Sequence, residues 1–175
     1  VGPENGLVVY LFSDVIEELF FYAQKKDAFG ILMGNGYLDS KIVQENTKPG
    51  VDKAPLREAQ FGIVDVPDYV EITAFKDIYP VKDALEYADH LRKMRNFRDT
   101  ESEGLCLGTV CLTSQSVDVS LECLFLMRAY FDMPTQILLF VSADNHPPRA
   151  YQLNKKQEFV EIGLDIVSLK GEKLP

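Results

Sequence analysis

The residues best suited to chemistry in this 175-residue chain are three cysteines and two histidines. Cys111 is the candidate nucleophile, and His146 and Asp144 could complete a thiol-hydrolase set. Nothing in the local sequence brings these three side chains together. His146 lies in a proline-bounded turn, which favours a surface position, and His90 falls on the polar side of a predicted helix. The sequence therefore offers little for acid–base or nucleophilic catalysis.

A cysteine metal site is also disfavoured by spacing. Cys106 and Cys111 are five positions apart in one predicted strand, and alternation along a straight strand places such side chains on opposite faces. Two thiols on opposite faces cannot share a zinc ion. The chain also lacks a glycine-rich phosphate-binding loop of either common kind.

Composition narrows the class of protein. The chain has 18 Lys and Arg against 27 Asp and Glu, and its net charge of −9 disfavours binding to nucleic acid or anionic membranes. An odd number of cysteines favours reduced thiols, and no apolar run approaches the ~20 residues of a membrane span. We expect a soluble cytoplasmic or nuclear protein. Residues 7–175 are predicted to form a single domain after a flexible or expression-derived segment at 1–6.

Hydrophobic periodicity predicts the elements that must position these residues. Helices are expected at 14–25, 81–97 and 120–131, because apolar residues recur there at three- and four-residue steps. Asn35-Gly36 predicts a type I′ hairpin turn between strands at 28–34 and 37–45. Further strands are expected at 7–12, 61–66, 69–75, 105–112, 136–142, 149–153 and 160–166, with a surface loop at 47–55. The order of elements predicts an α/β fold with a mixed central sheet flanked by helices.

Two of the predicted helices carry more apolar residues than one face of a sheet needs. Helix 120–131 is apolar almost all round, and helix 14–25 has a broad apolar stripe. Such surplus predicts an interaction surface for a protein partner or a second copy of the chain. The candidate contacts are Phe20, Phe21, Tyr22, Phe125, Arg128 and Tyr130.

Three stretches resemble the MPN (Mov34/Pad1 N-terminal) domain, the fold of the JAMM metalloproteases and their inactive relatives. Residues 27–34 look like the family's E-x-x-G-x-L-x-G hairpin start, and residues 107–114 look like the strand that reads G-W-Y-H-S-H-P in active members. Residues 134–141 and 148–153 look like the strand pair that follows. The resemblance covers nearly the whole chain and implies a three-layer, cytidine-deaminase-like architecture with a mixed central sheet.

The resemblance also implies where an active site would lie, and this chain departs from the family there. In JAMM enzymes two histidines and an aspartate hold zinc, and a glutamate takes a proton from the bound water. Cys111 and Thr113 stand at the histidine positions, and Asp27 stands for the glutamate. Cys123 stands for the aspartate if Ser120 opens the S-x-x-D element. We therefore expect no catalytic activity, metal or cofactor.

The leading functional hypothesis is a catalytically silent MPN-like scaffold. Inactive family members pair with other MPN domains in larger assemblies, so the resemblance implies a dimer with itself or with another such domain. The alternative is an atypical metal- or thiol-dependent isopeptidase or hydrolase that uses Cys111, Cys123 and Asp27. A third reading is an α/β domain of unrelated function, because fold alone does not determine function.

Overall fold

The computed structural model describes residues 7–37, 55–56, 69–94, 104–115, 118–144 and 146–168. These residues form eight strands and three helices. The strands are β1 (Val8–Phe12), β2 (Ala28–Tyr37), β3 (Pro55–Leu56), β4 (Tyr69–Tyr79), β5 (Leu105–Thr113), β6 (Ile137–Ser142), β7 (Arg149–Leu153) and β8 (Phe159–Val167). The helices are α1 (Ser13–Lys25), α4 (Ala84–Lys93) and α5 (Leu121–Tyr130).

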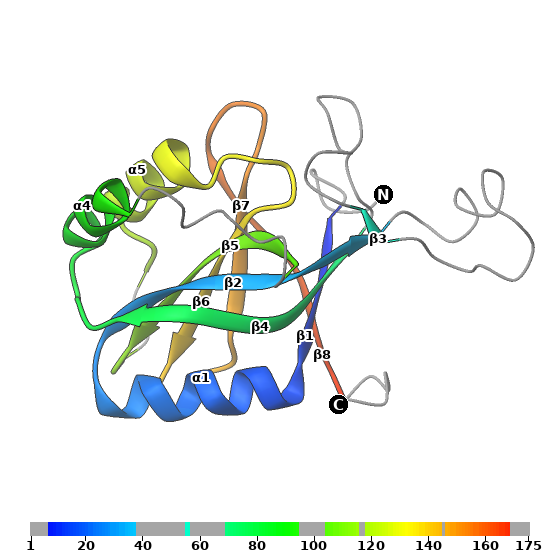
Figure 1. The fold of residues 1–175 in the computed structure, drawn as a ribbon, viewed down its shortest axis with the longest axis horizontal. Coiled ribbons are helices and arrows are strands. Elements are labelled where there is room, and N and C mark those ends of the chain that lie inside the picture. Colours follow the sequence, from blue (N-terminus) through cyan, green and yellow to red (C-terminus); the bar gives the residue numbers. More distant parts are fainter. Residues whose placement is uncertain are drawn as a thin grey trace, which may run out of the picture.

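Seven of the strands close into a mixed barrel. The order β2-β4-β1-β8-β7-β6-β5 returns to its start because β2 also pairs with β5, and the short β3 adds to the end of β2. Pairings of β1 with β4 and β8, and of β5 with β6, are parallel, and the other pairings in the ring are antiparallel. Figure 1 shows α1 on one side of these strands and α4 and α5 together on another.

The expected three-layer α/β architecture is therefore wrong. The sheet is mixed, as expected, but it is a closed barrel with three short helices and not an open sheet between helical layers. The reason is β2, whose ten residues pair with β4 along one side and with β5 along the other. Periodicity identifies strands, but it does not say which of them pair, so it could not predict this closure.

The barrel encloses one hydrophobic core. Every strand of the ring contributes to this interior cluster, which contains Leu7, Val9, Leu11, Ala28, Leu32, Val70, Ile72, Leu105, Leu107, Val110, Leu112, Ile137, Leu139, Val141, Ala150 and Ile162. Three buried residues of α1, Val15, Leu19 and Ala23, join it. Because α1 contacts β1 and β4 as well as β5 and β6, it lies across the barrel between opposite walls.

A second core lies outside the barrel, beneath α4 and α5. This outer cluster joins Phe29, Ile31, Met33, Cys106, Cys111, Leu138 and Phe140 of the strands to Val81, Ala84, Tyr87, Ala88, Leu91, Cys123, Leu126, Met127 and Phe131. Tyr87 stacks on Phe29 with ring centroids 5.0 Å apart. The strands β2, β5 and β6 are thus buried on both faces, which explains their nearly continuous apolar sequences.

A β-bulge in β5 changes which side chains share a face. The register with β2 shifts between Leu32 and Met33, which pair with Gly108 and Cys106. Gly108 has a φ of 117°, a backbone conformation that L side chains rarely adopt. Because of this bulge Cys106 and Cys111 both belong to the outer cluster, so the expectation that they lie on opposite faces is wrong.

The predicted type I′ turn at Asn35-Gly36 is also wrong. Asn35 pairs with Glu71 and Gly36 with Val70 inside β2, which continues to Tyr37. A type I′ turn requires positive φ at both central residues, and among the described residues only Asp77, Gln157, Gly104 and Gly108 have positive φ. Pairing with β4 on one side of β2 keeps this dipeptide extended.

The other predicted elements correspond to observed ones where the structure describes them, except that Pro55, expected at the end of a surface loop, begins β3. Helix α4 begins after Asp83, whose side chain accepts a hydrogen bond from Leu85 N at 2.8 Å, and not at Pro80. The predictions for 1–6, 38–45, 47–54, 61–66 and 95–97 lie outside the described residues. None of the helices in the described part of the chain is long and apolar enough to cross a membrane.

Candidate functional site

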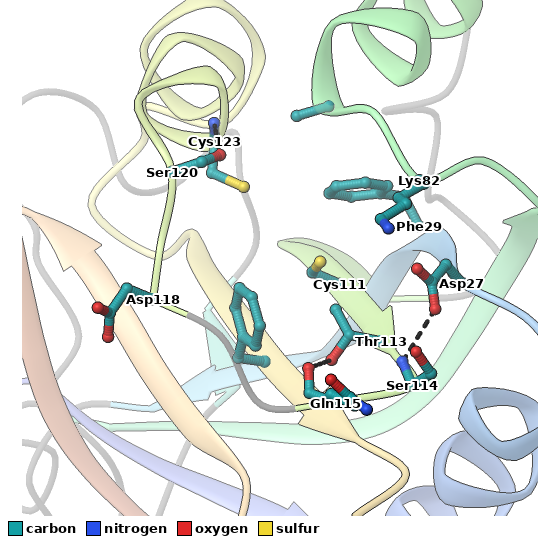
Figure 2. A pocket seen from close by; sticks show the side chains of 12 residues that line it. Asp27, Phe29, Lys82, Cys111, Thr113, Ser114, Gln115, Asp118, Ser120 and Cys123 are labelled. Atoms are coloured by element: carbon teal, nitrogen blue, oxygen red, sulfur yellow. Dashed lines mark hydrogen bonds between the residues drawn. The ribbon is translucent and has the colours of Figure 1, made fainter.

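A cavity of about 240 Å³ opens between the outer face of the barrel and the first turns of α4 and α5. Strands β2, β5 and β6 form its floor, and segments that lead into the two helices form its rim. The lining residues are Asp27, Phe29, Lys82, Ala84, Cys111, Thr113, Ser114, Gln115, Asp118, Ser120, Cys123 and Phe140. Figure 2 shows this arrangement, with Cys111 on β5 and Cys123 on α5.

All five positions singled out in the sequence line this one cavity. Asp27, Cys111, Thr113, Ser120 and Cys123 come from three separate stretches of chain, and the barrel brings them together.

Three of the polar side chains around the cavity are held by the backbone. Asp27 Oδ1 accepts a hydrogen bond from Ser114 N at 2.9 Å, and Thr113 Oγ1 donates one to Gln115 O at 2.8 Å (Figure 2). Ser120 caps α5 by accepting a hydrogen bond from Cys123 N at 3.2 Å. Each contact stabilises the loop or helix end that forms the cavity rim.

The pKa values of the two cavity cysteines are shifted in opposite directions. The neighbouring Cys111 side chain lowers the pKa of Cys123 to about 6, with further lowering by Ser120, although burial opposes the shift. The interaction with Cys123, together with burial, raises the pKa of Cys111 well above its ordinary value. The site therefore favours the thiolate form at Cys123 over the thiolate form at Cys111.

The two histidines do not line the cavity that contains Cys111 and Cys123. His146 and Asp144 interact at 2.9 Å between Nδ1 and Oδ1, but His146 lines a separate cavity with Ile16 and Phe20 of α1. His90 stacks on Tyr79 with ring centroids 3.8 Å apart. Since neither histidine lines the Cys111 cavity, the structure does not assemble the thiol-hydrolase set.

The described residues also contain no group of three or more His, Cys, Asp and Glu side chains placed to hold a metal ion. Thr113 is a poor ligand, and its hydroxyl is directed to Gln115 O. The cavity is therefore organised around a pair of thiols.

Sequence reasoning missed part of this cavity. Lys82 lies on the rim just before α4, and Ser114 and Gln115 follow β5. Asp118 lies just before α5, where an acid complements the helix dipole, and it lines the cavity as well. Lys82 carries no local signal in the sequence.

The six candidate interface residues divide between two separate surfaces. On α1, Phe21 is 54% exposed and Tyr22 is 40% exposed, whereas Phe20 packs against the interior cluster. On α5, Phe125 is 53% exposed, and Arg128 Nε donates a hydrogen bond to Gln157 O at 3.1 Å. Tyr130 packs partly against the outer cluster. The structure does not join these two sets, because α1 and α5 lie on different sides of the barrel (Figure 1).

The outer face of α1 carries two shallow depressions that share Tyr22. One, of about 440 Å³, is lined by Asp14, Glu17, Glu18, Phe21 and Tyr22. The other, of about 400 Å³, is lined by Tyr22, Lys25, Lys26, Ala28, Phe75, Lys76, Asp77, Ile78 and Pro80. The helix therefore has an acidic half and a basic half with exposed aromatic rings between them.

No protein-family model and no curated protein matches this chain. Among solved structures, the chain is similar to a protein from Desulfitobacterium hafniense whose solution structure was determined in a structural genomics programme. The two share 15% sequence identity, with a TM-score of 0.49, over 92% of this chain and 94% of that one.

Proposed function

We propose that this protein is a non-catalytic interaction domain that pairs with a second copy of itself through α1. The observation that carries the proposal is the outer face of α1, where exposed Phe21 and Tyr22 separate a cluster of acids from a cluster of lysines. Large aromatic side chains on a helix surface are typical of interface centres.

The charge pattern fits an antiparallel pair of α1 helices. In a symmetric dimer the same patch faces itself, so it must be self-complementary. If the two-fold axis passes between Phe21 and Tyr22, Glu18 of one copy faces Lys25 of the other, because both lie equally far from the axis. By the same reasoning Glu17 faces Lys26. Opposite charges meet in both of these pairs, while the aromatic rings meet at the centre.

Neighbouring residues extend the patch beyond the helix. The Tyr22 ring packs edge-on against Phe75 of β4 with centroids 5.9 Å apart. Lys25 Nζ lies 4.1 Å from the centroid of the Phe21 ring, which leaves the ring at the surface beside a positive charge. A pair of such patches is small for an interface, so we expect a dissociation constant on the order of micromolar.

Sedimentation equilibrium of charge-reversed variants tests this geometry. Glu17→Lys with Glu18→Lys makes the α1 face mainly basic, with Asp14 left unchanged, and Lys25→Glu with Lys26→Glu makes it acidic. Each double variant is expected to be monomeric alone because like charges meet across the axis. An equimolar mixture is expected to form heterodimers, since the basic face then meets the acidic one.

The control is Lys155→Glu with Lys156→Glu, two exposed lysines in the turn between β7 and β8. It changes net charge as much as the acidic variant but leaves α1 intact, so it should dimerise like the wild type. Wild-type protein that stays monomeric at hundreds of micromolar, or a mixture of reversed variants that stays monomeric, would overturn the proposal.

The resemblance to the MPN family also implies pairing with a second such domain. The resemblance itself is supported by a set of residues that gather around one cavity: Asp27, Cys111, Thr113, Ser120 and Cys123. Membership of the MPN family remains a prediction. The buried thiols fit a reducing cytoplasmic or nuclear compartment, which is part of this proposal.

A further inference from the structure

We propose that Cys123 and Cys111 form a redox-active dithiol, in which a small hydroperoxide oxidises Cys123 and Cys111 then closes an intramolecular disulfide. This site is distinct from the proposed pairing surface, because it lies in the cavity beside α5 and not on α1.

The geometry supplies the first argument. Cys111 and Cys123 line the same cavity, one from β5 and the other from the first turn of α5. Figure 2 shows the sulfurs of Cys111 and Cys123 turned toward the same space. Cys111 is 5% exposed and Cys123 is 4% exposed, so a reagent reaches them through the cavity and not from the open surface. A molecule as small as hydrogen peroxide fits a space of about 240 Å³.

The environment divides the roles between the two sulfurs. Cys123 lies in the first turn of α5, where its backbone N–H donates a hydrogen bond to the Ser120 cap, and its side chain shares the cavity with Cys111. These contacts favour the thiolate, which is the nucleophilic form. Cys111 is held as a thiol on the adjacent strand, which is the position of a resolving cysteine.

The chemistry balances with hydrogen peroxide as the oxidant. The Cys123 thiolate attacks one peroxide oxygen, the O–O bond breaks, and the hydroxide that leaves takes a proton to become water. The Cys111 thiol then loses its proton and attacks the sulfur of the Cys123 sulfenic acid, and a second water leaves. Two thiols are oxidised to one disulfide while one peroxide is reduced to two waters.

Lys82 and Asp27 stand on the rim of this cavity. Asp27 Oδ1 accepts a hydrogen bond from Ser114 N, which keeps this carboxylate at the rim. Hydrogen peroxide is neutral, so its binding does not require a charged side chain. We expect the cavity to select oxidants by size, and bulky disulfides to react poorly with Cys123.

Peptide mapping under non-reducing conditions tests the proposal on the full 175-residue chain. Reduced protein is treated with equimolar hydrogen peroxide at pH 7, quenched with an alkylating reagent, and digested. The expected product links the peptides that contain Cys111 and Cys123. In Cys111→Ser the disulfide cannot form, and dimedone should trap a sulfenic acid on Cys123.

Cys106 provides the matched control, because it is buried in the same outer cluster but does not line the cavity. Cys106→Ser should form the disulfide at the wild-type rate, and Cys123→Ser should react about tenfold more slowly with peroxide. Circular dichroism establishes that each variant is folded. Oxidation that spreads equally over all three cysteines, or a folded Cys111→Ser protein that dimedone does not label at Cys123, would overturn the proposal.

Discussion

Cys123 illustrates how a single position acquires its chemistry from its neighbours. The Ser120 cap is hydrogen-bonded to the first turn of α5, where the helix dipole also favours negative charge, and Cys111 faces the same cavity. The pKa of Cys123 falls to about 6 although the side chain is buried, and burial alone would raise it. Hydrogen bonding therefore outweighs desolvation at this thiol.

The first prediction concerns the pH dependence of Cys123 alkylation. Only the thiolate reacts, and a lowered pKa keeps the thiolate populated to lower pH. The rate with iodoacetamide should be half-maximal near pH 6 and constant above about pH 7. In urea, where the Cys111 and Ser120 contacts are lost, the midpoint should move to about 8.5. A midpoint in native protein equal to that in urea would contradict the assignment.

The variant Ser120→Ala tests what the helix cap contributes to stability and to the pKa of Cys123. Removing the hydroxyl should destabilise the fold by about 1 kcal/mol, because the amide of Cys123 loses its partner. It should also raise the midpoint of Cys123 alkylation, since Ser120 lowers that pKa. Urea denaturation gives the first quantity and the alkylation profile the second. Ser114→Ala, which keeps the backbone amide that binds Asp27, is the control and should change neither.

The contacts of Thr113 and Cys123 predict the absence of zinc chemistry in this cavity. Thr113 is bonded to Gln115 O, and Cys123 interacts with Cys111, so neither is arranged as the third ligand of a tetrahedral site. Purified protein should contain no stoichiometric zinc by elemental analysis, and added zinc should not raise the melting temperature. Chelator-sensitive cleavage of an isopeptide bond would contradict this prediction and revive the hydrolase alternative.

Among the elements, those with strong periodicity could be predicted from sequence, but their pairing could not. Helix α5 and strand β5 lie close to their predicted limits because continuous apolar runs and a Ser120 cap are local signals. The turn at Asn35-Gly36 failed because β4 pairs along this dipeptide and overrides the local preference. The closure between β2 and β5 depends on residues distant in sequence, and so does the cavity it creates.

Within strand β5, we expect Gly108 to tolerate substitution poorly. A Cβ there would lie 1.9 Å from Ile137 O, and the φ of 117° would be strained for any other residue. Gly108→Ala should therefore destabilise the fold by about 3 kcal/mol or more in urea denaturation. Gly163→Ala is the matched control, because a Cβ at Gly163 meets nothing within 4 Å. It should change stability by less than about 0.5 kcal/mol, and an equal loss for both variants would contradict the strain argument.

At the scale of the whole molecule, the barrel separates two surfaces with different properties. The interior cluster carries α1 and its charged, aromatic outer face, and the outer cluster carries α4, α5 and the dithiol cavity. The same strands, β2, β5 and β6, contribute to both clusters through their opposite faces. A rigid wall therefore lies between the proposed pairing surface and the proposed redox site.

This separation predicts that oxidation stabilises the fold without changing pairing. A Cys111–Cys123 disulfide would tie β5 to α5 and close a short loop, which restricts the unfolded chain and should add about 2 to 3 kcal/mol of stability. The urea midpoint of peroxide-treated protein should rise accordingly and return after reduction. The dimer dissociation constant should differ by less than about twofold between the two forms, because α1 contributes nothing to the cavity. The oxidised Cys106→Ser variant should behave like oxidised wild type, while Cys111→Ser should gain no stability. A disulfide that forms but dissociates the dimer would show that the barrel wall transmits the change, and the two sites would then have to be treated as one.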